Sequence, residues 1–221
     1  MTITMYSYIQ VSKNTGERHM LKALYKTILI LNMIFISSNT ASADDAWMRS
    51  YTLEAAGKYT AAAESIEKYL KQTPPNEFAE LRSGWLYYLA GNYSRSITHY
   101  KTAIKINKRS IDAMLGMSLP LMAQARWREA ALQTNNVINI SRFNYIAHTR
   151  LMSCEENLKQ WDKLQKHAEE IIQYYPSEAT ILVYLARAYS HNSNNKKAKE
   201  IYMQVLQRYP GHLEAINFLA K

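Results

Sequence analysis

The feature that most constrains the fold of this chain is a repeat with a period of about 34 residues. Gly57-Lys-Tyr59 and Gly91-Asn-Tyr93 lie one such period apart, and the aromatic slot recurs at Trp127 and Trp161. The slot three residues later is mostly small: it holds Ala62, Ser96, Ala130, Leu164 and Ala198. Chance amphipathicity repeats apolar residues every three or four positions, but it does not hold glycine, aromatic and alanine at one long offset. The chain is therefore predicted to be an array of similar units.

Composition favours helical units. The chain of 221 residues is 48% hydrophobic and 20% charged, and it has only 6 glycines and 5 prolines, so few turns are expected. Three of the prolines, Pro74, Pro176 and Pro210, stand near the ends of units, where a residue without a backbone N–H would stop a helix.

This pattern resembles the tetratricopeptide repeat, in which each unit of about 34 residues is a helix, a tight turn and a second antiparallel helix. The resemblance implies an all-α fold, an α-solenoid wound as a right-handed superhelix of about five helix-turn-helix repeats. It covers a domain over 44–221 and places the repeats near 43–76, 77–110, 111–144, 145–178 and 179–212, followed by a partial repeat, a capping helix over 213–221. Each unit would bury its apolar face only against its neighbours.

Two repeats depart from the pattern. The slot four residues after the small one, which we call the bulky slot, holds Ile66, Tyr100 and Tyr202 in three of the repeats. In repeat 4, Leu164 occupies the small slot and Ala168 the bulky slot, an exchange that would conserve volume. Repeat 3 carries Gly116 and Pro120 inside its predicted first helix. An interior proline costs about 3 kcal/mol unless it is accommodated, so a kink or a local opening is predicted there.

The first 43 residues have the order of an export signal. Lys22 and Lys26 precede the apolar run 28–36, and small residues at Ala41 and Ala43 end the segment. The apolar run is far shorter than the roughly 20 residues that cross a bilayer, which disfavours an uncleaved anchor. We therefore expect cleavage near Ala43, with Met20 as an alternative start to Met1. We also expect a periplasmic or secreted bacterial protein whose only contact with a membrane is through this signal.

The resemblance places function on the inner wall, which the first helices of the repeats would line. Read in that register, the side chains that we expect to bind a partner are Trp47, Tyr51, Phe78, Leu81, Trp85, Tyr88, Arg150 and Arg187. The aromatic residues would anchor a peptide or a partner helix, and the two arginines would meet a carboxylate. The alternative is that some of these rings only seal neighbouring helices. The paired Lys and Asn with which some relatives clamp a carboxylate are absent from the corresponding slots.

Catalytic, metal and nucleic-acid sites have no support in the sequence. No nucleophile has a base and an orienting group nearby, no Gly-rich phosphate loop occurs, and the six histidines form no metal-binding pair. We expect no cofactor, and we expect the single cysteine, Cys154, to be a buried packing residue. The chain has a formal net charge of +9, but its basic residues are dispersed and form no continuous stripe with stacking aromatics.

Three functions remain open. The first is a non-catalytic protein-binding scaffold or adaptor of the bacterial cell envelope, which captures a peptide or a partner helix in its groove. The second is an accessory subunit of an envelope glycan or polysaccharide export system that contacts sugar through its aromatic rings. The third is a cytosolic repeat chaperone, which requires that the first 43 residues are not a signal. Oligomerisation through the short sixth unit is also open.

Overall fold

The computed structural model describes residues 24, 26, 45–71 and 73–221. The predicted export signal therefore lies almost wholly outside the described residues. Over 45–71 and 73–221 the chain is built from helices and turns, with no strand. None of the helices in these ranges is long and apolar enough to cross a membrane.

The helices alternate as first and second members of pairs. A helix over 45–55 begins the described domain. It is followed by α3 (Tyr59–Leu70), α4 (Glu77–Leu89), α5 (Tyr93–Ile106), α6 (Ile111–Ala123), α7 (Trp127–Ile140), α8 (Tyr145–Asn157), α9 (Trp161–Ile171), α10 (Ala179–His191), α11 (Asn195–Arg208) and α12 (Leu213–Leu219). The first helices of the pairs are 45–55, α4, α6, α8 and α10, and α12 is the first helix of an incomplete sixth pair. The protein is thus an α-solenoid of helix-turn-helix repeats, as predicted.

The turn inside each helix pair explains why glycine recurs at positions 57 and 91. One residue in every turn has a positive φ, and these residues recur once in each repeat: Gly57, Gly91, Ala125, Lys159 and Ser193. In the second repeat, Asn92 donates its backbone N–H to the Tyr87 carbonyl at 2.8 Å, which closes the Schellman turn that a left-handed residue permits. Glycine adopts this conformation at no steric cost, and only the first two repeats use it.

The starts of the first helices are also periodic. Asn76, Ser110 and Asn144 each accept a hydrogen bond from the backbone N–H three residues later, at 3.1, 3.2 and 2.9 Å. Such caps satisfy donors that have no partner inside the helix. His212 does the same for α12 through its Nδ1, 3.2 Å from the backbone nitrogen of Ala215.

Neighbouring helices cross closely where small residues meet Tyr100. The Oγ of buried Ser96 donates to the Gly84 carbonyl at 2.7 Å, which ties α5 to α4. The Tyr100 ring lies between two glycines: a Cβ on Gly84 would stand 3.0 Å from ring carbons, and a Cβ on Gly116 would overlap the ring. Both glycines are therefore required by the approach of α4 and α6 to this ring.

The predicted opening of repeat 3 is not observed, because α6 runs as one helix through Pro120. Pro120 has no N–H to donate to the carbonyl of Gly116. The neighbouring Leu115 carbonyl accepts from Ser118 Oγ at 2.7 Å and from Arg150 of the next first helix. These bonds reach the Leu115 carbonyl and not the Gly116 carbonyl that Pro120 leaves without a donor, and α6 nevertheless continues to Ala123. In repeat 4, Leu164 and Ala168 are both fully buried in one cluster, as a volume-conserving exchange requires.

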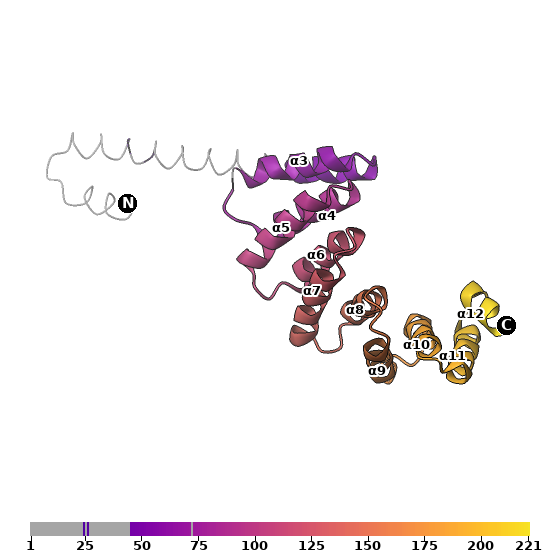
Figure 1. The fold of residues 1–221 in the computed structure, drawn as a ribbon. Coiled ribbons are helices and arrows are strands. Elements are labelled where there is room, and N and C mark those ends of the chain that lie inside the picture. The colour runs from indigo at the N-terminus through magenta and orange to yellow at the C-terminus, as the bar shows by residue number, and fades with distance from the viewer. Residues whose placement is uncertain (1–23, 25, 27–44, 72) are drawn as a thin grey trace.

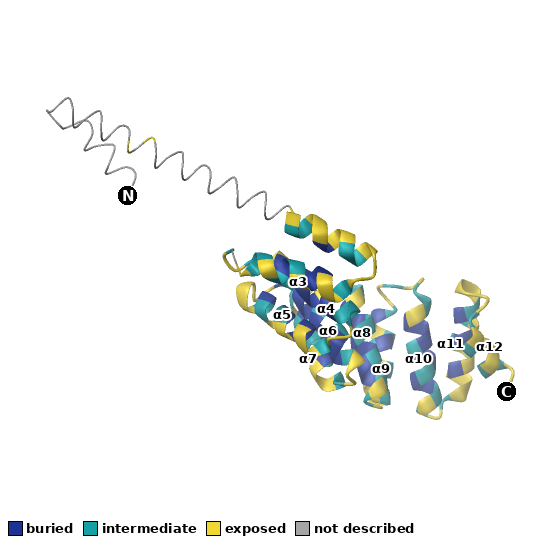
Figure 2. Ribbon diagram, turned by 90° about the horizontal axis from the view of Figure 1, so that it is seen from above, coloured by how far each residue is buried: buried dark blue, intermediate teal, exposed yellow. Residues whose placement is uncertain are grey.

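The pairs stack along a curve (Figure 1). The first helices α4, α6, α8 and α10 contact one another from repeat to repeat, whereas neighbouring second helices have few such contacts. The first helices therefore lie on the inner side of the curve, and α5, α7, α9 and α11 lie on its outer side (Figure 1). Buried residues form a band between the two layers, and exposed residues cover both outer surfaces (Figure 2).

Candidate functional site

The predicted partner-binding residues all lie on first helices. Trp47 and Tyr51 belong to the helix over 45–55, Arg150 to α8 and Arg187 to α10. The other four, Phe78, Leu81, Trp85 and Tyr88, belong to α4. We call the surface formed by the first helices the inner wall. Its first half, over 45–55 and α4, is aromatic, and its second half, over α8, α10 and α12, is polar and charged.

The aromatic half divides into exposed and half-buried side chains. Phe78 is 58% exposed, Tyr51 48% and Trp85 37%. Trp47, Leu81 and Tyr88 are half-buried. The first three therefore present apolar surface to solvent, and the other three also serve the packing of the helices, as the alternative interpretation of these rings anticipated.

Contacts between rings hold this half in place. Trp47 stacks on Phe78, with centroids 5.0 Å apart, and meets Tyr69 of α3 edge-on at 5.8 Å. The Trp85 indole N–H donates to Glu54 at 2.9 Å, and its ring lies 5.8 Å from that of Tyr88. Rings that are ordered before binding lose little conformational entropy when a partner arrives.

Arg82 of α4 completes the aromatic half, and sequence reasoning missed it. It is 8% exposed, its Nη1 lies 2.5 Å from a Glu54 carboxylate oxygen, and its Nε donates to Ser50 at 3.2 Å. Its guanidinium carbon lies 3.9 Å from the centre of the Tyr51 ring, a cation–π contact. A signal was present in the sequence, since Arg82 and the predicted Arg150 lie two repeat periods apart.

The polar half is organised around Arg187. Its guanidinium lies between Glu156 of α8, at 3.1 Å, and Glu214 of α12, at 2.8 Å from Nε, and Tyr202 donates to Glu214 at 2.6 Å. The hydrogen bonds from Arg187 hold the pKa of Glu214 below its usual value, while burial opposes them. A hollow of about 610 Å³ opens beside this network. Arg187 was predicted to meet a partner's carboxylate, but two carboxylates of its own chain already occupy it.

Arg150 is placed differently. Its Nη1 donates to the Leu115 carbonyl at 2.5 Å and to Ser118 Oγ at 3.0 Å, both on α6. The side chain is half-buried on the inner wall, where α8 follows α6. Of the two predicted arginines, it is the one without an acidic partner among the described residues.

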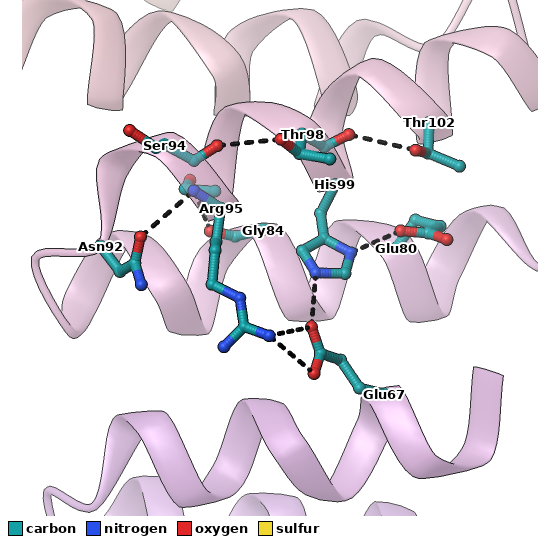
Figure 3. Close-up of polar contacts among 10 residues, drawn as sticks. Glu67, Glu80, Gly84, Asn92, Ser94, Arg95, Thr98, His99 and Thr102 are labelled. Atoms are coloured by element: carbon teal, nitrogen blue, oxygen red, sulfur yellow. Dashed lines mark hydrogen bonds and ion pairs between the residues drawn. The ribbon is translucent and has the colours of Figure 1, made fainter. Parts of the chain in front are cut away.

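Histidines link helices away from the aromatic half. His99 of α5 lies between Glu80 of α4, at 2.6 Å, and Glu67 of α3, at 3.1 Å, and Arg95 also reaches Glu67 (Figure 3). All hydrogen bonds of this network run between side chains, and they link repeat 1 to repeat 2. The residues of the network bond to one another, so they support the packing of α3, α4 and α5.

The equivalent place in repeat 4 holds a buried chain of hydrogen bonds. His148 Nε2 lies 2.8 Å from the Arg142 carbonyl, which only accepts, so this nitrogen carries a hydrogen. Neutral His148 then accepts at Nδ1 from His167 Nε2, 2.8 Å away. One proton remains between His167 Nδ1 and the buried Glu155, at 2.8 Å. Burial lowers the pKa of His148.

The described residues offer little to catalysis or to metals. Cys154 is fully buried, and burial raises the pKa of its thiol to about 11, so the nucleophilic thiolate is scarce at neutral pH. Over 45–71 and 73–221, no three His, Cys, Asp or Glu side chains are grouped so that they could hold a metal ion.

Comparison with known proteins gives the same architecture. Residues 181–212 match the model of the tetratricopeptide repeat family. No curated protein matches the sequence. Among solved structures, MamA from Desulfovibrio magneticus RS-1, from residue 41 to its end, is 14% identical, with a TM-score of 0.70 over 78% of this chain and 97% of that one.

Two further structures superpose in the same way. YrrB, described as a TPR protein with an unusual peptide-binding site, is 16% identical, with a TM-score of 0.69 over 84% of this chain and 95% of that one. TTC0263 of Thermus thermophilus, described as a thermophilic TPR protein, is 17% identical, with a TM-score of 0.56 over 80% of this chain and 97% of that one. At these identities the likeness concerns the fold. The chain therefore has the fold of tetratricopeptide repeat proteins, and its segment 181–212 carries the sequence signature of that repeat.

Proposed function

We propose that this protein is a non-catalytic scaffold that holds a peptide or a helix of a partner protein against its inner wall. The observation that carries the proposal is the exposure of Tyr51, Phe78 and Trp85 together on one half of that wall. Exposed aromatic side chains that are gathered on one surface commonly mark an interaction site, and tryptophan and tyrosine are frequent anchors of binding energy.

The surroundings of these rings suit a peptide. The charged groups beside them are paired within the chain, as Arg82 is with Glu54, so the exposed surface is apolar while its edges carry hydrogen-bonding groups. Such a combination takes up an apolar side chain and orients the backbone that carries it. YrrB, which shares the fold, is described as having a peptide-binding site, and this supports the same class of ligand here.

We further propose that the scaffold works in the bacterial cell envelope, after cleavage near Ala43. The order of positive, apolar and small residues over 22–43 supports this location. Amino-terminal sequencing of the protein recovered from an envelope fraction tests it. A mature chain that begins at Asp44 is expected, whereas an uncleaved chain recovered from the cytosol would favour the chaperone alternative.

The binding proposal is tested with a random library of displayed ten-residue peptides. The double variant Tyr51→Ala/Trp85→Ala should lose at least about tenfold in affinity for the peptides that the wild type selects, about 1.4 kcal/mol. Tyr174→Ala is the matched control, because Tyr174 is 49% exposed, as Tyr51 is at 48%, but lies in the loop after α9. The control should bind like the wild type.

Two results would contradict the proposal. The wild type retains no peptide, or the double variant and the control lose affinity equally. Thermal melts of both variants separate lost binding from lost structure: a melt of the double variant far below that of the control would assign its rings to the core. A glycan array probed in parallel decides the sugar alternative, since binding of sugars without peptides would favour an accessory subunit of a glycan system.

A further inference from the structure

Two arginines of the inner wall occupy equivalent places. Arg82 of α4 and Arg150 of α8 lie two repeat periods apart. Each reaches back to a serine of the preceding first helix: Arg82 to Ser50 at 3.2 Å and Arg150 to Ser118 at 3.0 Å. The two serines are also separated by two periods. The solenoid therefore pairs these two positions twice, through Nε in Arg82 and through Nη1 in Arg150.

The two places differ in their counter-ion. Glu54 forms an ion pair with Arg82, with a shortest distance of 2.5 Å. The residue two periods after Glu54 is Met122, which carries no charge. Among residues 45–71 and 73–221, no Asp or Glu forms an ion pair with Arg150. The repeat that ends the aromatic half thus has a complete arginine–carboxylate pair, and the repeat that begins the polar half has only the arginine.

The surroundings of Arg150 keep its charge and leave part of it free. Burial lowers the pKa of Arg150, and the groups that act on it electrostatically are the hydroxyls of Tyr100 and Tyr88. A guanidinium still holds its proton at any physiological pH, so burial cannot neutralise it. Only Nη1 is bonded, to Leu115 and Ser118. Nε and Nη2 have no hydrogen bond to the described residues, and the side chain is only half-buried.

A half-buried cation without an anion is an arrangement that a carboxylate completes, because a guanidinium and a carboxylate match in shape and in charge. We propose that Arg150 receives a carboxylate of the bound partner at its Nε and Nη2, and that this carboxylate has the role that Glu54 has at Nη1 of Arg82. This inference rests on the proposed function, and it names the chemistry of the partner: an acidic group close to an apolar or aromatic side chain. Tyr88 connects the aromatic half of the wall with Arg150. Its ring lies 5.8 Å from that of Trp85, and its hydroxyl acts electrostatically on Arg150.

The test uses a library of ten-residue peptides made as matched twins. In one set of twins, Asp and Glu are replaced by Asn and Gln; in the other, a free carboxyl terminus is replaced by an amide. The two sets distinguish a side-chain carboxylate from a terminal one. The wild type should prefer the acidic member of one set by about tenfold or more, since bonds between charged groups contribute about 1.5 kcal/mol or more.

Met122→Glu is the decisive variant, because it supplies within the chain the carboxylate that Arg82 already has. It should abolish the preference for acidic twins and keep the selection of apolar and aromatic side chains. Met122→Gln is the matched control, with nearly the same shape and no charge, and it should keep the acidic preference. Arg150→Gln should lose that preference as Met122→Glu does, which keeps the proposal testable if Met122→Glu fails to fold.

Each outcome separates the two proposals. A wild type that selects peptides but retains acidic and amide twins equally overturns the role of Arg150 and leaves the scaffold proposal standing. Persistence of the acidic preference in Arg150→Gln overturns the role in the same way. A wild type that retains no peptide in any set overturns both.

Discussion

Replacing Gly116 by alanine tests the packing on which the inner wall depends. Gly116 lies inside α6, and an added Cβ would overlap the Tyr100 ring; even the third nearest ring atom, Cδ1, would stand only 2.9 Å away. Tyr100 is 3% exposed and is packed between α4 and α6, so the ring has no free space into which it could turn. Overpacking costs about 1–3 kcal/mol, and an overlap this close with the ring places this variant in the upper part of that range, at about 2–3 kcal/mol.

A smaller term opposes this cost. Alanine is favoured over glycine inside a helix by about 1 kcal/mol. The net loss in the free energy of unfolding should therefore be about 1–2 kcal/mol, or a fall of about 3–6 °C in the melting temperature for a domain of this size. Gly84→Ala is the control, because its Cβ would lie 3.0 Å from the same ring and needs only a slight adjustment. Its stability should stay within about 0.5 kcal/mol of the wild type, because mild overpacking and the gain in helix propensity nearly cancel.

Urea denaturation followed by circular dichroism measures both variants, and a double-mutant cycle with Tyr100→Leu identifies the cause. Leucine lacks the distal ring atoms that the new Cβ would overlap, so in that background Gly116→Ala should show only its gain in helix propensity, about 1 kcal/mol. The coupling between the two sites should then equal the steric cost, about 2–3 kcal/mol. An equal cost of Gly116→Ala in both backgrounds would refute the steric explanation. A variant as stable as the wild type would show that α6 adapts without strain.

Three further measurements follow from the ionisable groups. Because burial lowers the pKa of His148 in the folded chain, the unfolded chain takes up the proton first, and stability present above about pH 6.5 should fall as the pH drops below it; His148→Gln should flatten this part of a urea-denaturation profile. The pKa of Glu214 is also lowered, so its contribution should be present above about pH 4.5 and lost as the pH falls further; Glu214→Gln should melt below the wild type at neutral pH but not in strong acid. The buried Cys154 thiol should react with a thiol reagent only after denaturant opens the chain, and rapid reaction of the native protein would contradict its burial.

Local rules in the sequence anticipated the solenoid because each of them repeats. One helix pair requires a small residue at Ser96, a bulky residue at Tyr100 and a turn residue at Gly91. Because each pair packs only on its neighbours, the same requirements recur in every repeat. The turn shows how far the rule extends. Ala125, Lys159 and Ser193 adopt the left-handed conformation that glycine takes earlier, so the backbone repeat is stricter than the sequence repeat.

The irregularity predicted for repeat 3 shows where local rules stop. Pro120 removes a backbone donor, and by itself this favours a break in α6. The helix nevertheless stays whole from Ile111 to Ala123 and packs against its neighbours, with its Leu115 carbonyl bonded to Arg150 of the next repeat. A rule that considers only α6 does not include contacts of this kind between repeats.

The sequence by itself determined the class of fold, because helix period, turn residues and repeat length are properties of neighbouring residues, and its resemblance to a known repeat implied which helices line the wall. Only the tertiary structure decided which side chains remain open to a partner. Arg187 and Arg150 look alike in the sequence, yet Glu156 and Glu214 occupy the first, and the place that would hold a carboxylate beside the second contains Met122. Charged side chains pair with residues that stacking brings close from successive repeats. The sequence of a single repeat therefore does not show which charges are paired.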